Sequence, residues 1–519
     1  MGKNGGVGQG IKTRRGIVAV GLAALIVGAT TVGPLATVKP ATSPVSSTTA
    51  VTVKKLVWSP CYDNKNYDCA RLAVPLDRTK PAGEGVSLSI LRVRASKKSK
   101  RLGVLLINPG GPGASGRTFA TQLAVNPIFD KIRQSYDIVG WDPRGVGESA
   151  PIRCLDSAAY DRFFAADPNP DTPAERENLL DATKEFVEGC KARNGAILDH
   201  VSTADTVADM DHIREALGEA TISYAGFSYG TYLGARYADA YPKRVGRFVL
   251  DGALDPLATT ERRTELQAIG FERALTNFLA TCKSTKCRFV RNGETPMGAF
   301  DRLMASFEAK PLPVKWVFKK KSTTRLLGPG EGYTAVLAAL YNVSVGWPRL
   351  RSALSTLDGG DGRAMLQLFD LYADRNPEGD YRNTSDANAA VNCTDLPNST
   401  NVADYDALAK RFEKVSPHFG AFAAYSTLVC AYWPSTGPTP RPVRAASSAP
   451  IVILGTTNDP ATPFVWAQSL NRQLVTSRLV TFESDGHTAL LSGNLCIRKI
   501  VERYLILGEL PENNIICRR

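Results

Sequence analysis

Short apolar runs of strand length alternate with segments of helical periodicity over the first half of the chain. The strand-length runs are 103–108, 136–142, 222–225 and 247–251. Between them lie helical patterns such as residues 203–217, where apolar side chains recur every three or four positions. Strands that alternate with helices in this way predict an α/β fold, with a mostly parallel, doubly wound sheet.

Two further groups of strands flank this region. Residues 71–76 and 86–94 alternate between apolar and polar positions and predict a leading antiparallel hairpin. Apolar strand patterns resume at residues 450–455 and 478–483, and a final helix is predicted over 495–507.

The pattern between these parts is mostly helical, with Pro- and Gly-rich breaks. We expect an inserted cap over residues 256–449, which covers the site and selects substrate. Residues 56–255 and 450–519 then form the two parts of the core. The predicted cap helices are 266–280, 296–309, 332–341, 347–357, 362–373 and 404–412. Within the first part of the core, residues 151–200 are predicted to form a polar helical excursion.

The N-terminus has the composition of an export signal. A basic, Gly-rich start is followed by an apolar stretch from Gly16 to Val38, so residues 1–39 predict a signal peptide. An uncleaved anchor helix is the alternative, and the twin-arginine or general export route stays open. Residues 40–55 predict a disordered linker. We expect a secreted or extracytoplasmic protein, with the cell envelope as an alternative location. No stable membrane insertion is expected after removal of the signal peptide.

Charge excludes little once its position is considered. The formal net charge is +13, but seven basic residues lie within the first 55 positions, which hold no acid. The remaining +6 over 464 residues gives no argument for nucleic-acid binding.

Ten cysteines support export, because disulfides persist in oxidising compartments. They fall into neighbouring couples, and sequential pairing is predicted. The couples are Cys61/Cys69, Cys154/Cys190, Cys282/Cys287, Cys393/Cys430 and Cys496/Cys517. No C-x-x-C motif occurs and there are only four histidines, so neither a metal nor a cofactor is expected.

The motif G-x-S-x-G occurs at Gly226–Gly230, between a strand and a helix. A nucleophilic serine on a sharp strand-to-helix turn needs small neighbours two residues away on either side. This predicts Ser228 as a nucleophile, with the Tyr229 N–H facing a developing oxyanion. The alternative is a small-residue turn that packs a helix on a sheet.

A second glycine cluster, Pro109 to Gly116, follows the strand at 103–108. Such a cluster can cradle a phosphate, but no phosphate-loop or dinucleotide pattern is present. The alternative, an oxyanion donor from Gly110 or Gly111, is favoured because Ser228 lies downstream.

A serine hydroxyl requires a general base, and the base requires an orienting acid. His487 follows a terminal strand, where loops gather at the C-terminal edge of the sheet. Asp459 follows the previous strand, and Asp485 is the second candidate acid. The order Ser228, Asp459, His487 is that of the α/β-hydrolases.

Several further motifs occur in one order along the chain: Asn108–Gly113, Trp141–Gly147, Leu250–Pro256, Cys430–Pro434 and Asn458–Pro463. With the serine motif, they resemble the secreted actinobacterial tripeptidyl aminopeptidases, relatives of proline iminopeptidase, over residues 55–519. By position, Ser228, Asp459 and His487 match the triad of that family, and Gly111 and Tyr229 match its oxyanion donors. Asn108 stands where proline iminopeptidases have histidine.

The resemblance implies an exported serine exopeptidase that acts on peptides with a free N-terminus. There are two alternatives. One is a secreted carboxylesterase or lipase of the same fold, and the other is a non-catalytic binding or envelope protein that retains the fold. An aminopeptidase needs carboxylates for the substrate ammonium, because an unpaired buried charge is costly. Glu272, Glu331 and Asp395 are candidates, although surface or capping roles are favoured for each.

Overall fold

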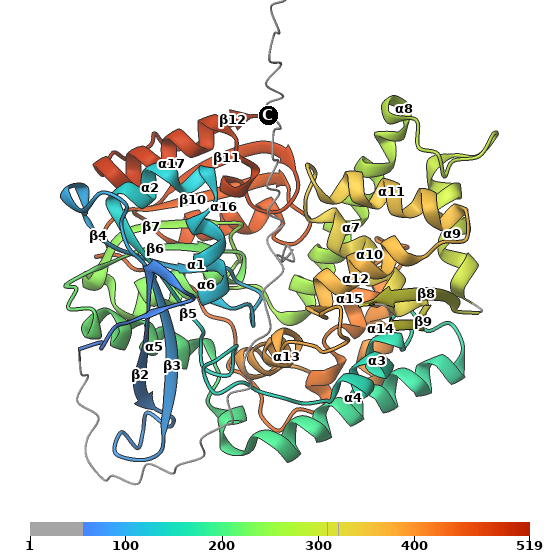
Figure 1. Ribbon diagram of the computed structural model, residues 1–519, viewed down its shortest axis with the longest axis horizontal. Helices are drawn as coiled ribbons and strands as arrows, with labels where there is room; N and C mark the ends of the chain where they lie inside the picture. Colours follow the sequence, from blue (N-terminus) through green and yellow to red (C-terminus); the bar gives the residue numbers. More distant parts are fainter. Residues whose placement is uncertain (1–54, 309, 320) are drawn as a thin grey trace, which may run out of the picture.

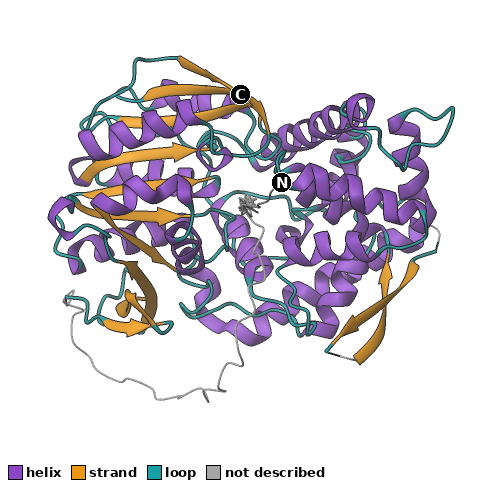
Figure 2. Cartoon of the chain, turned by 45° about the horizontal axis from the view of Figure 1, so that its top comes forward, coloured by secondary structure: helices purple, strands orange, loops and turns teal. Residues whose placement is uncertain are grey.

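The computed structural model describes residues 55–308, 310–319 and 321–519. The predicted signal peptide and all of the predicted linker but residue 55 lie outside the described residues. The chain forms a lobe built on a sheet and a lobe built mostly of helices, which lie side by side (Figures 1 and 2). No helix in the described ranges has the length and apolarity that crossing a membrane would require.

One sheet of ten strands forms the centre of the first lobe, in the order β1-β2-β3-β5-β4-β6-β7-β10-β11-β12. The first three strands pair antiparallel, as does β3 with β5, and all later pairs are parallel. The predicted leading hairpin and parallel sheet are therefore confirmed. The strands are β1 (Ser59–Cys61), β2 (Asn64–Pro75), β3 (Gly85–Val93), β4 (Gly103–Asn108), β5 (Tyr136–Trp141), β6 (Ile222–Phe227), β7 (Val245–Asp251), β10 (Ile451–Asn458), β11 (Arg478–Asp485) and β12 (Ile515–Arg518).

Helices cover both faces of the sheet, which explains why its central strands are apolar at nearly every position. Leu105 and Leu106 are adjacent in β4 and are both fully buried, but they point into different cores. One core includes α1 (Gly116–Ala124), α2 (Asp130–Ser135) and α17 (Leu495–Leu507), and the other includes α5 (Thr203–Ala216), α6 (Tyr229–Ala240) and α16 (Phe464–Gln473).

The second lobe consists largely of helices from the predicted insertion. They are α7 (Thr260–Ala280), α8 (Cys282–Thr285), α9 (Pro296–Glu308), α10 (Pro329–Leu340), α11 (Gly346–Asp358), α12 (Arg363–Ala373), α13 (Thr384–Asp395), α14 (Val402–Phe412) and α15 (Gly420–Tyr425). The helical prediction omitted an antiparallel hairpin of β8 (Leu312–Phe318) and β9 (Lys321–Leu327). We refer to this lobe as the cap.

The polar excursion at residues 151–200 packs against the helices of the insertion. Its helices are α3 (Ser157–Ala165) and α4 (Pro173–Asn194), and both lie beside cap helices in Figure 1. Tyr160 stacks on Tyr381 with ring centroids 4.8 Å apart, and Arg176 forms an ion pair with Asp406. The cap therefore contains a segment from the first part of the chain as well as the insertion.

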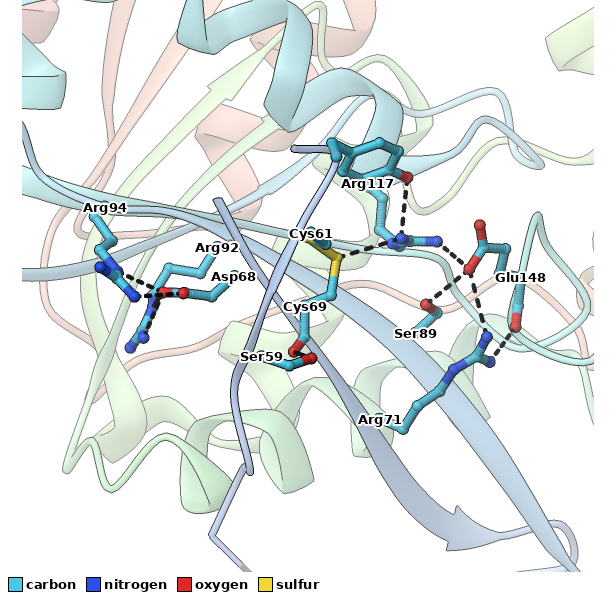
Figure 3. The surroundings of a disulfide bond; sticks show 11 residues. Ser59, Cys61, Asp68, Cys69, Arg71, Ser89, Arg92, Arg94, Arg117 and Glu148 are labelled. Atoms are coloured by element: carbon cyan, nitrogen blue, oxygen red, sulfur yellow. Dashed lines mark hydrogen bonds and ion pairs between the residues drawn. A yellow bond between two sulfur atoms is a disulfide. The ribbon is translucent and has the colours of Figure 1, made fainter. Parts of the chain in front are cut away.

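All ten cysteines form the five sequential disulfides that the spacing predicts. Figure 3 shows the first of them, Cys61–Cys69, beside Arg117 at the start of α1. The Arg117 guanidinium donates to the Tyr62 hydroxyl at 3.0 Å and pairs with Glu148 at 2.5 Å. The turn between β1 and β2 and the loop after β5 therefore both contact the start of α1, the helix that follows the glycine cluster.

Candidate active site

Ser228 occupies the sharp turn between β6 and α6. Its backbone has φ 55° and ψ −125°, a conformation that a residue with a side chain rarely adopts. The Ser228 N–H donates to Asp251 O at 2.9 Å, which ties the turn to the end of β7. Tyr229 begins α6, so its N–H has no acceptor within the helix and lies at the positive end of the helix dipole.

The spacing of the serine motif has the steric cause that the sequence predicts. A Cβ on Gly230 would lie 2.7 Å from Asn108 O and 2.9 Å from Asn108 Oδ1, which is too close for any side chain. Asn108 is itself fully buried at the end of β4, and its Oδ1 accepts from the Gly110 N–H at 2.9 Å. The asparagine that replaces histidine in this motif therefore orders the glycine cluster.

The glycine cluster lies directly against the serine turn. A Cβ on Gly110 would lie 2.4 Å from Phe227 O and 2.9 Å from Tyr229 N. The structure thus brings Gly110 beside Tyr229, and Gly111 follows with φ +104°. Two segments more than 100 residues apart meet at the turn, each with main-chain N–H groups of the kind that stabilise an oxyanion.

His487 and Asp459 form a buried pair at the carboxyl ends of β11 and β10. His487 Nδ1 lies 2.9 Å from both Asp459 Oδ1 and Asp459 Oδ2. The side chains of both residues are almost inaccessible to solvent, at 1% and 0% exposure. This contact fixes the ring so that Nε2 is the nitrogen left for chemistry.

Asp459 is held by four donors besides the histidine. Its oxygens accept from the main-chain N–H groups of Ala461, Thr462 and Thr488 and from the Thr462 hydroxyl, at 2.8 to 3.2 Å. The Thr462 hydroxyl also lies 3.2 Å from His487 Nδ1. Asp485, the other candidate acid, instead accepts from Asn277 Nδ2 at 2.6 Å.

The His487 imidazole lies next to the end of β7, where Asp251 accepts from the Ser228 N–H. Gly252 follows the residue that accepts from Ser228 N–H, and a Cβ on Gly252 would lie 3.1 Å from His487 Cε1. His487 Nε2 is buried, and no described residue forms a hydrogen bond with it. The cap contacts His487 through Tyr341. The Tyr341 carbonyl oxygen accepts from the His487 N–H at 2.8 Å, and the two rings meet edge to face.

Asp251 is a residue of this site to which sequence reasoning assigned no role. Its fully buried carboxyl accepts from the N–H groups of Ala489 and Leu490, each at 2.8 Å, just after His487. Burial raises the pKa of Asp251 to about 7, against the opposing effect of these two donors. Through its main chain and side chain, Asp251 joins the serine turn to the histidine loop. A carboxylate at a strand end is too common for sequence to single out.

The three carboxylates considered for a substrate ammonium all have internal partners. Glu272 Oε1 lies 2.6 Å from His418 Nδ1, and Glu331 Oε2 accepts from Gly328 N–H at the start of α10. Asp395 accepts from the Thr203 N–H at 2.6 Å and from the Thr203 hydroxyl. Burial raises the pKa of Glu331 to about 7 and that of Asp395 to about 6.

The other histidines have different surroundings. His212 lies on α5, where burial lowers its pKa, and His418 pairs with Glu272 and Asp301 within the cap. His200 O accepts from the buried Arg144. In the described ranges, no group of three histidine, cysteine, aspartate or glutamate side chains could hold a metal ion.

Comparison with known protein families and curated proteins gives relatives with the same fold. Residues 103–292 match the family described as alpha/beta hydrolase fold, and residues 416–517 match the family described as TAP-like protein. Among curated proteins, the chain is 34% identical to serine protease Hip1 of Mycobacterium tuberculosis over 481 residues, which cover 89% of this chain and 90% of the relative. The chain belongs to the TAP-like α/β-hydrolases.

Two other relatives bear different names. Carboxylesterase B of Mycobacterium tuberculosis is 35% identical over 458 residues, 86% of each chain. Tripeptidyl aminopeptidase of Streptomyces lividans is 31% identical over 474 residues, 89% of this chain and 86% of the relative. The TAP-like chain described here is therefore a serine hydrolase, with relatives named for peptide and for ester substrates.

Proposed function

We propose that the protein is an exported serine exopeptidase that releases short peptides or residues from free N-termini. Ser228 is the nucleophile, His487 the general base and Asp459 the residue that orients His487. The observation that carries this proposal is the buried Asp459–His487 pair. Its Nε2 has no hydrogen-bond partner among the described residues, and the pair lies beside Asp251, whose main-chain oxygen accepts from the Ser228 N–H.

The reaction proceeds through an acyl-enzyme. His487 Nε2 takes the Ser228 hydroxyl proton as Oγ bonds to the scissile carbonyl carbon. The Tyr229 N–H and the Gly111 N–H donate to the oxyanion. As the tetrahedral intermediate collapses, the imidazolium gives its proton to the leaving amine and the C–N bond breaks. Water then gives a proton to His487 and adds to the acyl carbon, and the acid product leaves as Ser228 regains its proton.

Export is supported by the cysteines. The five disulfides join consecutive cysteines of the chain, and disulfides persist mainly outside the reducing cytosol. The first 39 residues have the composition of a signal peptide.

Peptide substrates are favoured by the relatives named serine protease and tripeptidyl aminopeptidase. A carboxylesterase is the second candidate, because a relative of the same similarity bears that name. Both activities would use the same three side chains.

The two candidates differ in whether the substrate amine is read. The test compares a tripeptidyl naphthylamide with a free N-terminus, the same compound with an acetylated N-terminus, and a p-nitrophenyl ester. An exopeptidase cleaves the first and loses most of its kcat/KM on the second. Equal cleavage of the two naphthylamides would contradict N-terminal recognition, and cleavage of the ester alone would favour the carboxylesterase.

A further inference from the structure

Helix α13 lies between the sheet lobe and the bulk of the cap (Figure 1). It carries many small and polar residues, and its side chains contact three separate segments of the sheet lobe. One segment is the glycine cluster, which contains the proposed donor Gly111. The other two, the loop after β5 and the start of α5, are hydrogen-bonded to Ser115 of that cluster and to Tyr229.

Just before α13, the N-cap residue Asn383 is bonded to the loop after β5. Its Nδ2 donates to Gly145 O at 2.8 Å and to Ile152 O at 3.0 Å, and its Oδ1 accepts from Gly147 N–H. In the same loop, Asp142 accepts from the Ser115 hydroxyl at 2.5 Å, at the end of the glycine cluster. The N-cap residue of α13 thus holds the loop that is bonded to this cluster.

In the middle of the helix, Asn388 contacts the glycine cluster directly. Its Nδ2 donates to Pro112 O at 3.0 Å, and Asn392 Nδ2 donates to Asn388 Oδ1, which fixes the orientation of the amide. A Cβ on Gly113 would lie 2.4 Å from Thr384 O and 3.0 Å from Asn388 N, so the two main chains touch. Pro112 directly follows Gly111, the proposed donor.

At the end of the helix, Asp395 is linked to Tyr229 through one residue. Asp395 accepts from the main-chain N–H and the hydroxyl of Thr203, and Thr203 Oγ1 is hydrogen-bonded to the Tyr229 hydroxyl. All three side chains are buried. The Cys393–Cys430 disulfide ties this end of α13 to the rest of the cap.

We propose that α13 positions both donors of the oxyanion hole: Asn388 is a positioning residue for Gly111, and Asp395, through Thr203, is a positioning residue for Tyr229. This inference rests on the proposed function. Main-chain donors stabilise a transition state only when they are held in place before the charge develops, and these donors belong to segments far apart in sequence. A helix bonded to both segments supplies that common support.

The test measures turnover and the inhibition constant of a peptide aldehyde, which forms a tetrahedral oxyanion on the serine. Asn388→Ala should lower kcat by roughly 10- to 100-fold, less than the roughly 10²- to 10³-fold effect of removing a donor outright. KM should stay within about twofold, because ground-state binding is unchanged. The aldehyde inhibition constant should rise in proportion to the fall in kcat. A merely structural substitution would lower the melting temperature without this proportionality.

Asn398→Ala is the matched control, because Asn398 lies in the same lobe just after α13 and, in the part of the chain that the structure describes, its Nδ2 donates to Leu396 O alone. It should keep wild-type kcat and aldehyde affinity. Thr203→Val removes the hydroxyl that links Asp395 to Tyr229 without a substitution in α13 itself, and it should repeat the effect of Asn388→Ala. This second variant decides the matter if Asn388→Ala does not fold.

Wild-type values in folded Thr203→Val, together with wild-type values in any Asn388→Ala that folds, would overturn the role of α13 and leave the proposed function intact. A wild-type protein that neither turns over the peptide substrate nor binds the aldehyde would instead overturn the proposed function.

Discussion

The two sides of the candidate active site are held by different parts of the molecule. On the base side, the His487 ring is fixed by Asp459 and Thr462, which both belong to the sheet lobe. On the oxyanion side, the glycine cluster and Tyr229 are supported from the cap, through Asn388 and through Asp395 and Thr203. The cap also contacts the base side: Tyr341 touches His487 through its main chain and its ring, and Gln267 Nε2 in α7 donates to Ala461 O at 2.8 Å, in the loop of Asp459.

The difference follows from what each side must hold. An imidazole is oriented by one carboxylate, and short local loops after two adjacent strands can supply both groups. Oxyanion donors are main-chain N–H groups, so whole segments must be placed relative to each other. We infer that the side chains that activate Ser228 come from the sheet lobe, whereas the main-chain donors for the oxyanion are held in place partly by side chains of the cap.

The largest change in kcat is expected on the base side, from substitution of the acid that orients His487. Asp459→Asn should lower kcat by roughly 10⁴-fold, because the amide favours the wrong tautomer of the imidazole. Steady-state turnover of a tripeptidyl naphthylamide measures this. Asp485→Asn is the matched control: it alters only the contact with Asn277, so kcat should stay within about threefold of wild type. A greater loss in Asp485→Asn than in Asp459→Asn would reverse the assignment.

The next effect tests the oxyanion side alone. Gly110→Ala places a methyl group 2.4 Å from Phe227 O, which forces the glycine cluster away from the serine turn. We expect kcat to fall by roughly 10²- to 10³-fold with the folded state retained, as when one donor is lost. Turnover and circular dichroism together measure this.

Gly218→Ala controls for the backbone conformation of this substitution. Gly218 also has a positive φ, of +75°, but its Cβ would meet no atom within 4 Å. It should cost about 1 kcal/mol of stability and leave kcat unchanged. If the two glycine variants behave alike, the contact between the cluster and the serine turn has no catalytic role.

The smallest effect tests whether the cap acts on catalysis only through α13. The Glu272–His418 pair joins α7 to the loop before α15, within the cap. Burial disfavours the charge on His418, but the hydrogen bonds and charges of Glu272 and Asp301 together outweigh burial and raise the pKa of His418. Burial likewise opposes the charge on Glu272, but the hydrogen bonds and charge of His418, with the hydrogen bond from Ser416, outweigh burial and lower the pKa of Glu272.

The sign of the pH dependence follows from these directions. The raised pKa of His418 contributes stability that is complete below about pH 6.5 and is lost as the pH rises through the pKa in the folded protein. Glu272→Gln should lower Tm at pH 6 by about 1–3 °C and reduce the fall in Tm between pH 6 and pH 9. It should not change kcat. A kcat reduced in step with Tm would show that the whole cap, rather than α13, supports the site.

The sequence allowed much of the sheet lobe to be predicted, because its signals are local. The continuous apolar runs, the turn at Ser228 and the loops at Asp459 and His487 each lie within a few residues of a strand end. The neighbouring cysteines likewise indicated their own partners. Asp251 was missed because its importance lies in two bonds to a loop more than 230 residues away.

The cap was harder to predict for a physical reason. The buried face of α13 includes Asp386, Thr394 and Asp395 beside small alanines, so no strongly apolar face marks it, and its polar residues serve as contacts to other segments. The hairpin β8–β9 lies on the surface with only one strongly buried position in β8, which is a weak strand signal. Tertiary contacts, which one sequence does not reveal, decide both elements.

The central claim is that Ser228 is a nucleophile activated by His487. A fluorophosphonate probe, followed by mass spectrometry of the digested protein, tests it most directly. The account predicts a single adduct on Ser228 in the folded protein, absent from Ser228→Ala and strongly reduced in His487→Ala. A folded wild-type protein without an adduct, or an adduct on another residue that persists in Ser228→Ala, would contradict it.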